Sequence, residues 1–85
     1  MAEEKIGTVA NYFAKVGVAA ITITEGSLKV GDRVQFKGST TDFEQSIDSM
    51  QVEHQEVQEA QTGDSVGLKA KERVRKGDTV YRVTD

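Results

Sequence analysis

Histidine, whose imidazole can exchange a proton near neutral pH, occurs once in this sequence, at His54. The acidic residues Glu53 and Glu56 lie close to it, so a proton-transfer site or a metal site is the chemistry to consider. A metal site needs several ligands that converge, however, and adjacent residues of a strand point to opposite faces of a sheet. We therefore expect His54 to have a structural or surface role, and we expect no metal and no cofactor.

Carboxylates and hydroxyls are numerous, but they form no recognisable catalytic pattern. Asp48, Glu53, Glu56 and Glu59 could in principle supply the two carboxyl groups that a glycosidase places across a cleft, although a chain of this size has little room for one. No serine lies in a nucleophile-elbow sequence, and the phosphate-binding pattern Gly-x4-Gly-Lys-Ser/Thr is absent. The sequence therefore predicts a protein that is not an enzyme and does not bind GTP.

Charge is distributed unevenly along the chain, although the net charge is only −3. Residues 44–68 contain six acidic residues and no lysine or arginine, whereas residues 69–85 contain six basic residues and three acidic ones. Such basic groups can neutralise the phosphates of RNA or contact an acidic protein surface. They can equally form the hydrated face of a strand and pair in part with the acidic segment. The candidate contact residues for RNA or a partner are the five that lie closest together: Lys69, Lys71, Arg73, Arg75 and Lys76.

The aromatic residues are scattered along the chain rather than grouped in a base-stacking motif. Phe36, Tyr81 and Phe13 are expected in the core, because large apolar side chains are usually buried. Tyr12 and Phe43 are the two aromatic residues whose exposure would bear on a nucleic-acid surface.

The elements that must position these side chains are indicated by a motif that occurs three times, Gly-Asp-x-Val. Glycine adopts a positive φ angle without a steric penalty, and aspartate can hydrogen-bond the backbone two residues further on, so the pair reverses the chain tightly. Valine then begins a strand. The expected turn residues are Gly31 and Asp32, Gly63 and Asp64, and Gly77 and Asp78. Turns of this kind predict a small all-β barrel.

Six segments carry the alternation or the β-branched composition of strands. They are residues 5–13, 16–24, 33–37, 43–54, 66–71 and 79–84. Gly17 interrupts the second segment, where we expect a bulge. The fourth segment is ambiguous, because Ile47, Met50 and His54 have helical spacing while Met50 and His54 also fit the alternation of a strand. We favour a strand there.

The length and composition predict one domain, residues 1–85, with an ordered core from about residue 5 to residue 84. The chain of 85 residues contains no proline and no linker-like segment. Because it also lacks cysteine, we expect a reducing compartment, with the cytoplasm as the default. The N-terminal segment is acidic and no run of about eighteen apolar residues occurs, so neither a signal peptide nor a membrane span is expected.

Three segments in a fixed order resemble a known family. Residues 28–34, 59–68 and 75–78 are similar to stretches of the second domain of elongation factor Tu, and the pattern is also similar to the β-barrel domains of initiation factor two. The resemblance extends over residues 5–83 and implies a closed, six-stranded antiparallel β-barrel of the translation-protein type. Gln51 and Lys69 stand where the family has a glutamate and a leucine of its tRNA-end pocket, so that pocket is not carried over.

These observations together predict a non-enzymatic binding module. In this interpretation the protein docks on the ribosome, on RNA or on a translation-associated protein through one face. The alternative is an accessory or scaffolding barrel that pairs with a separate enzyme subunit and contacts no nucleic acid. Salt separates the two, because counterions are released when phosphates are bound, whereas a largely apolar protein interface responds little.

Overall fold

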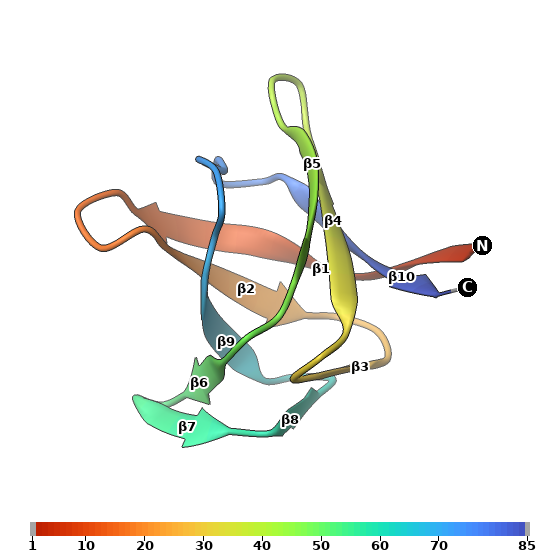
Figure 1. Cartoon of the computed structure of the whole chain (residues 1–85), viewed down its shortest axis with the longest axis vertical. Helices are drawn as coiled ribbons and strands as arrows, with labels where there is room; N and C mark the ends of the chain where they lie inside the picture. Colours follow the sequence, from red (N-terminus) through yellow and green to blue (C-terminus); the bar gives the residue numbers. More distant parts are fainter. Residues whose placement is uncertain (1, 85) are drawn as a thin grey trace.

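The regular structure of this protein consists of β-strands. The computed structural model describes residues 2–84, and these residues form strands and no helix (Figure 1). A helix of the length and apolarity needed to cross a membrane is accordingly not found in the described chain. The strands are β1 (Ala2–Phe13), β2 (Val18–Ile23), β3 (Ser27–Lys29), β4 (Arg33–Lys37), β5 (Asp42–Ser46), β6 (Met50–Val52), β7 (Gln55–Val57), β8 (Glu59–Gln61), β9 (Ser65–Lys69) and β10 (Thr79–Thr84).

Eight of these strands form one sheet in the order β5-β4-β10-β1-β2-β9-β6-β7, while β3 and β8 pair with each other in a second sheet. The pairings are antiparallel. The long strand β1 pairs with β10 on one side and with β2 on the other. Its register shifts between Lys5 and Gly7 and again between Val9 and Asn11, and such irregularities bend a strand. The sheet therefore curves, and β5 at one edge comes back toward the chain that follows β9 (Figure 1).

The all-β class predicted from the sequence is confirmed, and each of the six expected segments contains a strand. The structure adds the short strands β3, β7 and β8, and it divides residues 43–54 into β5 and β6. The division arises because Ile47 pairs with a turn instead: its N–H donates to the carbonyl of Asp32 at 2.9 Å. The bulge expected at Gly17 is wrong, since this residue has a φ of 68° and lies in the turn between β1 and β2.

Buried apolar side chains from most strands form one core. In β2, Ala19, Ile21 and Ile23 are buried while the residues between them are half-exposed, as expected for a strand with one face on the core. Phe36 on β4 is fully buried, and its ring stacks on that of Phe43 on β5 with 5.0 Å between the ring centroids. This core fixes the strands whose ends and turns form the surface grooves described below.

The three Gly-Asp motifs form turns of one geometry. Each glycine has a φ between 95° and 99°, and each aspartate N–H donates to the carbonyl three residues earlier at 2.9–3.1 Å, as in a type II turn. The aspartate carboxylate also accepts a hydrogen bond from the N–H of that earlier residue, at 2.9–3.0 Å. The expectation that aspartate bonds two residues further on is therefore wrong: the tight reversal brings the carboxylate back over the start of the turn. The residues it reaches are Lys29, Gln61 and Arg75.

Each turn also docks on one buried residue from another part of the chain. The glycine N–H donates to the carbonyl of that residue, and the N–H of that residue donates to the carbonyl of the aspartate, at 2.8–3.0 Å. Because these bonds join distant segments, the turns are held against the core rather than standing free. The pairs are Gly31 and Asp32 with Ile47, Gly63 and Asp64 with Ile23, and Gly77 and Asp78 with Val9.

Candidate functional site

Candidate sites in this molecule are identified from the shape and the charge of its surface. In residues 2–84, no group of three or more histidine, aspartate or glutamate side chains is placed to hold a metal ion. His54 lies in the exposed turn between β6 and β7, next to Glu53. Two well-formed grooves offer such features, one of mixed charge and one with more apolar than polar surface.

The first groove has a volume of about 650 Å³ and lies between the β4–β5 hairpin and the chain that follows β9. A glutamine joins its two walls: Gln45 Nε2 donates to the carbonyl of Lys69 at 2.8 Å, and Gln45 Oε1 accepts from the N–H of Lys71 at 2.5 Å. Both acidic and basic side chains line this groove, so we call it the mixed-charge groove. It is lined by Arg33, Glu44, Gln45, Ser46, Asp48, Lys69, Ala70 and Lys71.

The five basic residues predicted to contact RNA or a partner lie at the end of β9 and on the loop after it, and all five are exposed. Two of them, Lys69 and Lys71, line the mixed-charge groove together with Glu44 and Asp48. Carboxylates close to these ammonium groups reduce the local positive potential. This end of the basic segment is therefore not a uniformly positive surface.

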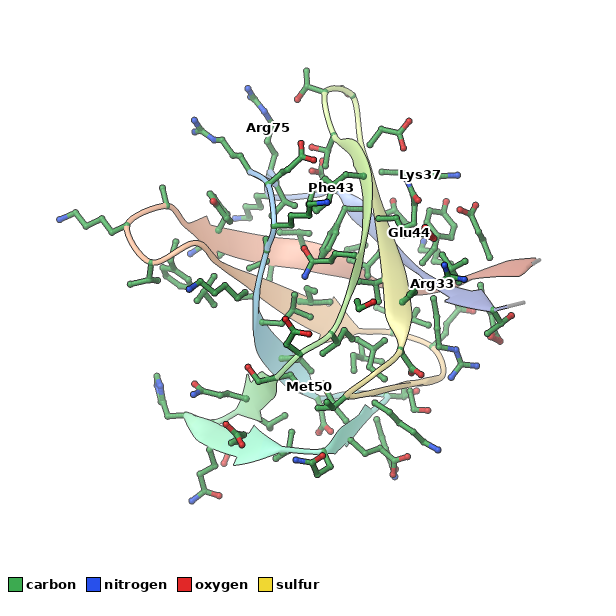
Figure 2. All side chains as sticks on the ribbon, viewed as in Figure 1. Arg33, Lys37, Phe43, Glu44, Met50 and Arg75 are labelled. Atoms are coloured by element: carbon green, nitrogen blue, oxygen red, sulfur yellow. The ribbon has the colours of Figure 1, made fainter. Side chains whose placement is uncertain are left out.

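The other three basic residues, Arg73, Arg75 and Lys76, line neither groove. They lie on both sides of Val74, which is only 1% exposed and anchors this loop in the core. Figure 2 shows Arg75 at the outer end of the loop, pointing away from the strands. A phosphate-binding surface would have to be formed mainly by these three side chains.

The second groove has a volume of about 670 Å³ and opens between two hairpin turns, the one that joins β1 to β2 and the one that joins β6 to β7. Phe13 at the end of β1 and Val16 on the first turn are 49% and 60% exposed, although both side chains are large and apolar. We call this the apolar groove. It is lined by Phe13, Val16, Val18, Ala20, Gln51, Val52, Glu53, His54, Gly63, Asp64, Ser65 and Gly67.

The exposure of Phe13 contradicts the expectation that this residue belongs to the core. Strand β10 pairs with β1 only as far as Thr8, so the last residues of β1 extend past that neighbour and pair with β2 alone. Phe43, in contrast, is 9% exposed and lies against Phe36. The signal in the sequence that could have revealed the groove is Val16, an apolar residue in a turn.

The turn between β6 and β7 is made by two residues with positive φ angles, Glu53 at 53° and His54 at 64°. Two-residue hairpin turns of this left-handed kind are normally built from Asn-Gly or Asp-Gly. For other residues the conformation costs about 1–2 kcal/mol each, because Cβ lies close to the following carbonyl oxygen. Both side chains line the apolar groove, so one of its walls is a strained turn.

Two ion pairs outside these grooves connect the start of β1 to β4 and β10. Lys37 Nζ lies 2.8 Å from Glu3 Oε1 and 5.3 Å from the centroid of the Tyr81 ring. The hydrogen bond with Glu3 raises the pKa of Lys37 above its ordinary value. Arg82 pairs with Glu4 at 3.0 Å. Such exposed pairs contribute little to stability, and they join β1 to β4 and β10 rather than forming a binding site.

Comparison with known proteins finds similarity over most of the chain. Residues 17–81 match the family described as elongation factor Tu domain 2. An uncharacterized protease of Methanocaldococcus jannaschii is 42% identical over 78 residues, which cover 91% of this chain and 19% of that protein. A collagenase of Porphyromonas gingivalis is 35% identical over 78 residues, which cover 91% of this chain and 22% of that protein.

A solved structure is similar over nearly its whole length. It is the selenomethionine variant of the C-terminal domain of a "putative U32 peptidase" of Geobacillus thermoleovorans. The TM-score is 0.84 at 25% sequence identity, and the match covers 91% of this chain and 96% of that one. The chain thus corresponds to nearly all of that domain, whereas it spans about a fifth of the length of the curated relatives.

Proposed function

The chain belongs to the elongation factor Tu domain 2 family, and we propose that it is a non-enzymatic protein-interaction module that pairs with the catalytic unit of a U32-type peptidase. The observation that carries the proposal is the 42% identity over 78 residues with one part of a protease. The structural likeness to a peptidase C-terminal domain supports it. A domain that accompanies peptidase sequences and has two open grooves is suited to contacting the catalytic unit.

The apolar groove supports binding better than catalysis. His54, Asp64 and Ser65 all line it, which is the composition of a Ser-His-Asp triad. Such a triad requires histidine to bond both the serine and the aspartate. Among the described residues no hydrogen bond joins these three side chains, and the Asp64 carboxylate accepts instead from the N–H of Gln61 at 2.9 Å. The proposed role is therefore docking without turnover.

We further propose that the curved sheet closes into a barrel of the translation-protein type. The support comes from Gln45 on the edge strand β5, whose side-chain amide bonds both the carbonyl of Lys69 and the N–H of Lys71. These two backbone groups lie on one side of their chain, where a neighbouring strand would bond them. The glutamine thus takes the place of a strand residue and links the edge of the sheet to the chain after β9.

Replacing Gln45 with alanine is expected to lower the free energy of unfolding by about 1 kcal/mol, because an intramolecular hydrogen bond contributes roughly 0.5–1.5 kcal/mol net. Amide exchange at Lys71, measured by NMR, should become faster. The matched control is Gln35→Ala, since Gln35 Nε2 donates to Asp42 Oδ1 within the β4–β5 hairpin and does not bridge the groove. Equal exchange at Lys71 in the wild type and in Gln45→Ala would contradict closure at this position.

The proposed function is tested by mixing the purified chain with the purified catalytic unit of a U32-type peptidase from the same organism. Sedimentation should show a one-to-one complex that survives ribonuclease. Its affinity should change by less than about threefold between 50 and 200 mM salt, because no counterions are released from nucleic-acid phosphates. Absence of a complex at about 100 μM, a concentration at which even weak specific contacts are populated, would reject the proposal. Cleavage of peptides by the chain alone would reject its non-enzymatic part.

Docking on RNA or the ribosome is the competing proposal, and the exposed basic loop is the observation that favours it. If five phosphates were contacted, affinity should fall by roughly 100- to 500-fold between 50 and 200 mM salt, the smaller value applying to a single strand. Changing Arg73, Arg75 and Lys76 together to glutamate should then abolish retention on ribosomes at low salt. The peptidase complex should be unaffected by the same changes if the main proposal holds. Unchanged ribosome retention in this variant would remove the nucleic-acid interpretation.

A further inference from the structure

The apolar groove has two walls, formed by hairpin turns, and a floor formed in part by small residues. Figure 1 shows the β1–β2 and β6–β7 hairpins projecting on the same side of the molecule, with β2 and β9 between them. Ala20 on β2 and Gly67 on β9 are paired across the floor. Because these residues are small, the space between the hairpin turns is not filled by side chains of the floor. A protruding side chain of another molecule can enter there.

The wall formed by the β1–β2 turn presents apolar surface to solvent. Phe13 and Val16 are the large apolar side chains that stand out as exposed in the described chain, and both face this one groove. Val18 and Val52, each half-buried, extend the apolar lining inward. Clustered apolar side chains that remain exposed in an otherwise polar protein indicate an interaction surface.

The charge of the lining has a single sign. Glu53 and Asp64 contribute carboxylates, and no lysine or arginine is among the lining residues. Lys15 belongs to the same turn as Val16 but does not line the groove. Residues 44–68, which supply one wall and part of the floor, contain six acidic residues and no lysine or arginine. A basic group is therefore the charged group that this surface attracts.

We propose that the apolar groove receives an apolar side chain flanked by lysine or arginine, carried on a surface segment of the peptidase catalytic unit. This inference rests on the proposed function and assigns the surface through which it acts. The apolar side chain covers Phe13 and Val16, and the basic side chain lies beside Glu53. The positive φ angles of the β6–β7 turn hold Glu53 and His54 in the opposite wall.

Binding of the peptidase catalytic unit is measured by calorimetry for the wild type and for two groove variants. The double change Phe13→Ser and Val16→Ser should weaken binding at least about tenfold, because a central apolar contact is lost. Glu53→Lys should weaken binding at least about fivefold at 50 mM salt, and the difference should shrink at 500 mM as the charges are screened. The matched control is Arg75→Ala, an exposed residue that lines neither groove and should bind within about twofold of the wild type. Melting temperatures should fall by no more than about 4–8 °C, the shift that corresponds to about 1 kcal/mol in a domain of this size, because the altered side chains are exposed.

A photoreactive benzophenone amino acid at position 16 should cross-link to the catalytic unit, and the same group at position 75 should not. If the wild type forms no complex, the proposed function itself is rejected. If the wild type binds and both groove variants bind equally well, or cross-links form only from position 75, the groove assignment is wrong while the proposed function stands. Self-association of the chain that is lost in the double variant would assign the groove to a second copy and overturn the inference.

Discussion

Replacing Phe36 with alanine is expected to lower the free energy of unfolding by about 3–5 kcal/mol. The side chain is 0% exposed, and its ring stacks on Phe43 in the middle of the core. An 85-residue domain has a total stability of roughly 4–13 kcal/mol, so this single change can remove most of it. Urea denaturation followed by circular dichroism measures the change, with the slope of the transition showing whether unfolding remains two-state.

The control for this prediction is Phe13→Ala, which removes the same side chain from an exposed position. Phe13 is 49% exposed and extends past the end of the β1–β10 pairing, so its loss should cost less than about 1 kcal/mol. A similar loss of stability in both variants would mean that the end of β1 is packed into the core in solution. In that case the apolar groove would not exist in the form described.

The positions of the three Gly-Asp turns could be predicted because the signal is local. Glycine followed by aspartate indicates a reversal wherever the pair occurs in the motif, and all three glycines have the positive φ that such a turn needs. The residues on which the turns dock could not be predicted in the same way. Gly63 bonds Ile23 and Gly77 bonds Val9, and these contacts depend on how the whole sheet curves. The sequence therefore predicts where the turns lie, but it does not predict which core residues they bond.

Most of the shortest strands could not be predicted from sequence patterns, for a related reason. Strands β3, β7 and β8 contain three residues each, and a two-residue period cannot be recognised in so short a segment. The turn between β6 and β7 also lacks its usual signal, because Glu53 and His54 occupy positions that normally hold asparagine and glycine. Such a mismatch between sequence and conformation is expected where a segment is shaped for binding.

The two grooves show what charge and hydropathy alone could and could not reveal. The basic segment from Lys69 to Lys76 was visible as a run of exposed charges, and its exposure is confirmed. Pairing with the acidic segment was foreseen, but the particular neighbours Glu44 and Asp48 could not be identified, because they come from β5 and the loop after it, on the opposite side of the mixed-charge groove. In the same way, the sequence suggests a core position for Phe13. It does not show that β10 stops pairing with β1 at Thr8 and leaves the end of β1 uncovered on that side.

Replacing Gly7 with alanine is expected to destabilise the protein by at least about 3 kcal/mol, the upper part of the range for overpacking. A Cβ at this position would lie 2.1 Å from the carbonyl oxygen of Thr22 and 3.2 Å from Cα of Ile23. Both atoms belong to the backbone of β2, which is itself paired on its other side with β9, so neither can move aside cheaply. Gly7 also lies at the irregularity where β1 bends between its two partners.

The matched control is Gly67→Ala, a glycine-to-alanine change in another strand of the same sheet. A Cβ at Gly67 would have Val18 Cγ1 as its nearest neighbour at 3.6 Å, which is ordinary contact, and no positive φ restricts the position. The change should therefore alter the free energy of unfolding by no more than about 1 kcal/mol, in either direction. Thermal and urea unfolding of both variants separate a steric effect from a general effect of alanine. If Gly7→Ala were as stable as Gly67→Ala, β1 and β2 could not approach as closely as the curvature of this sheet requires.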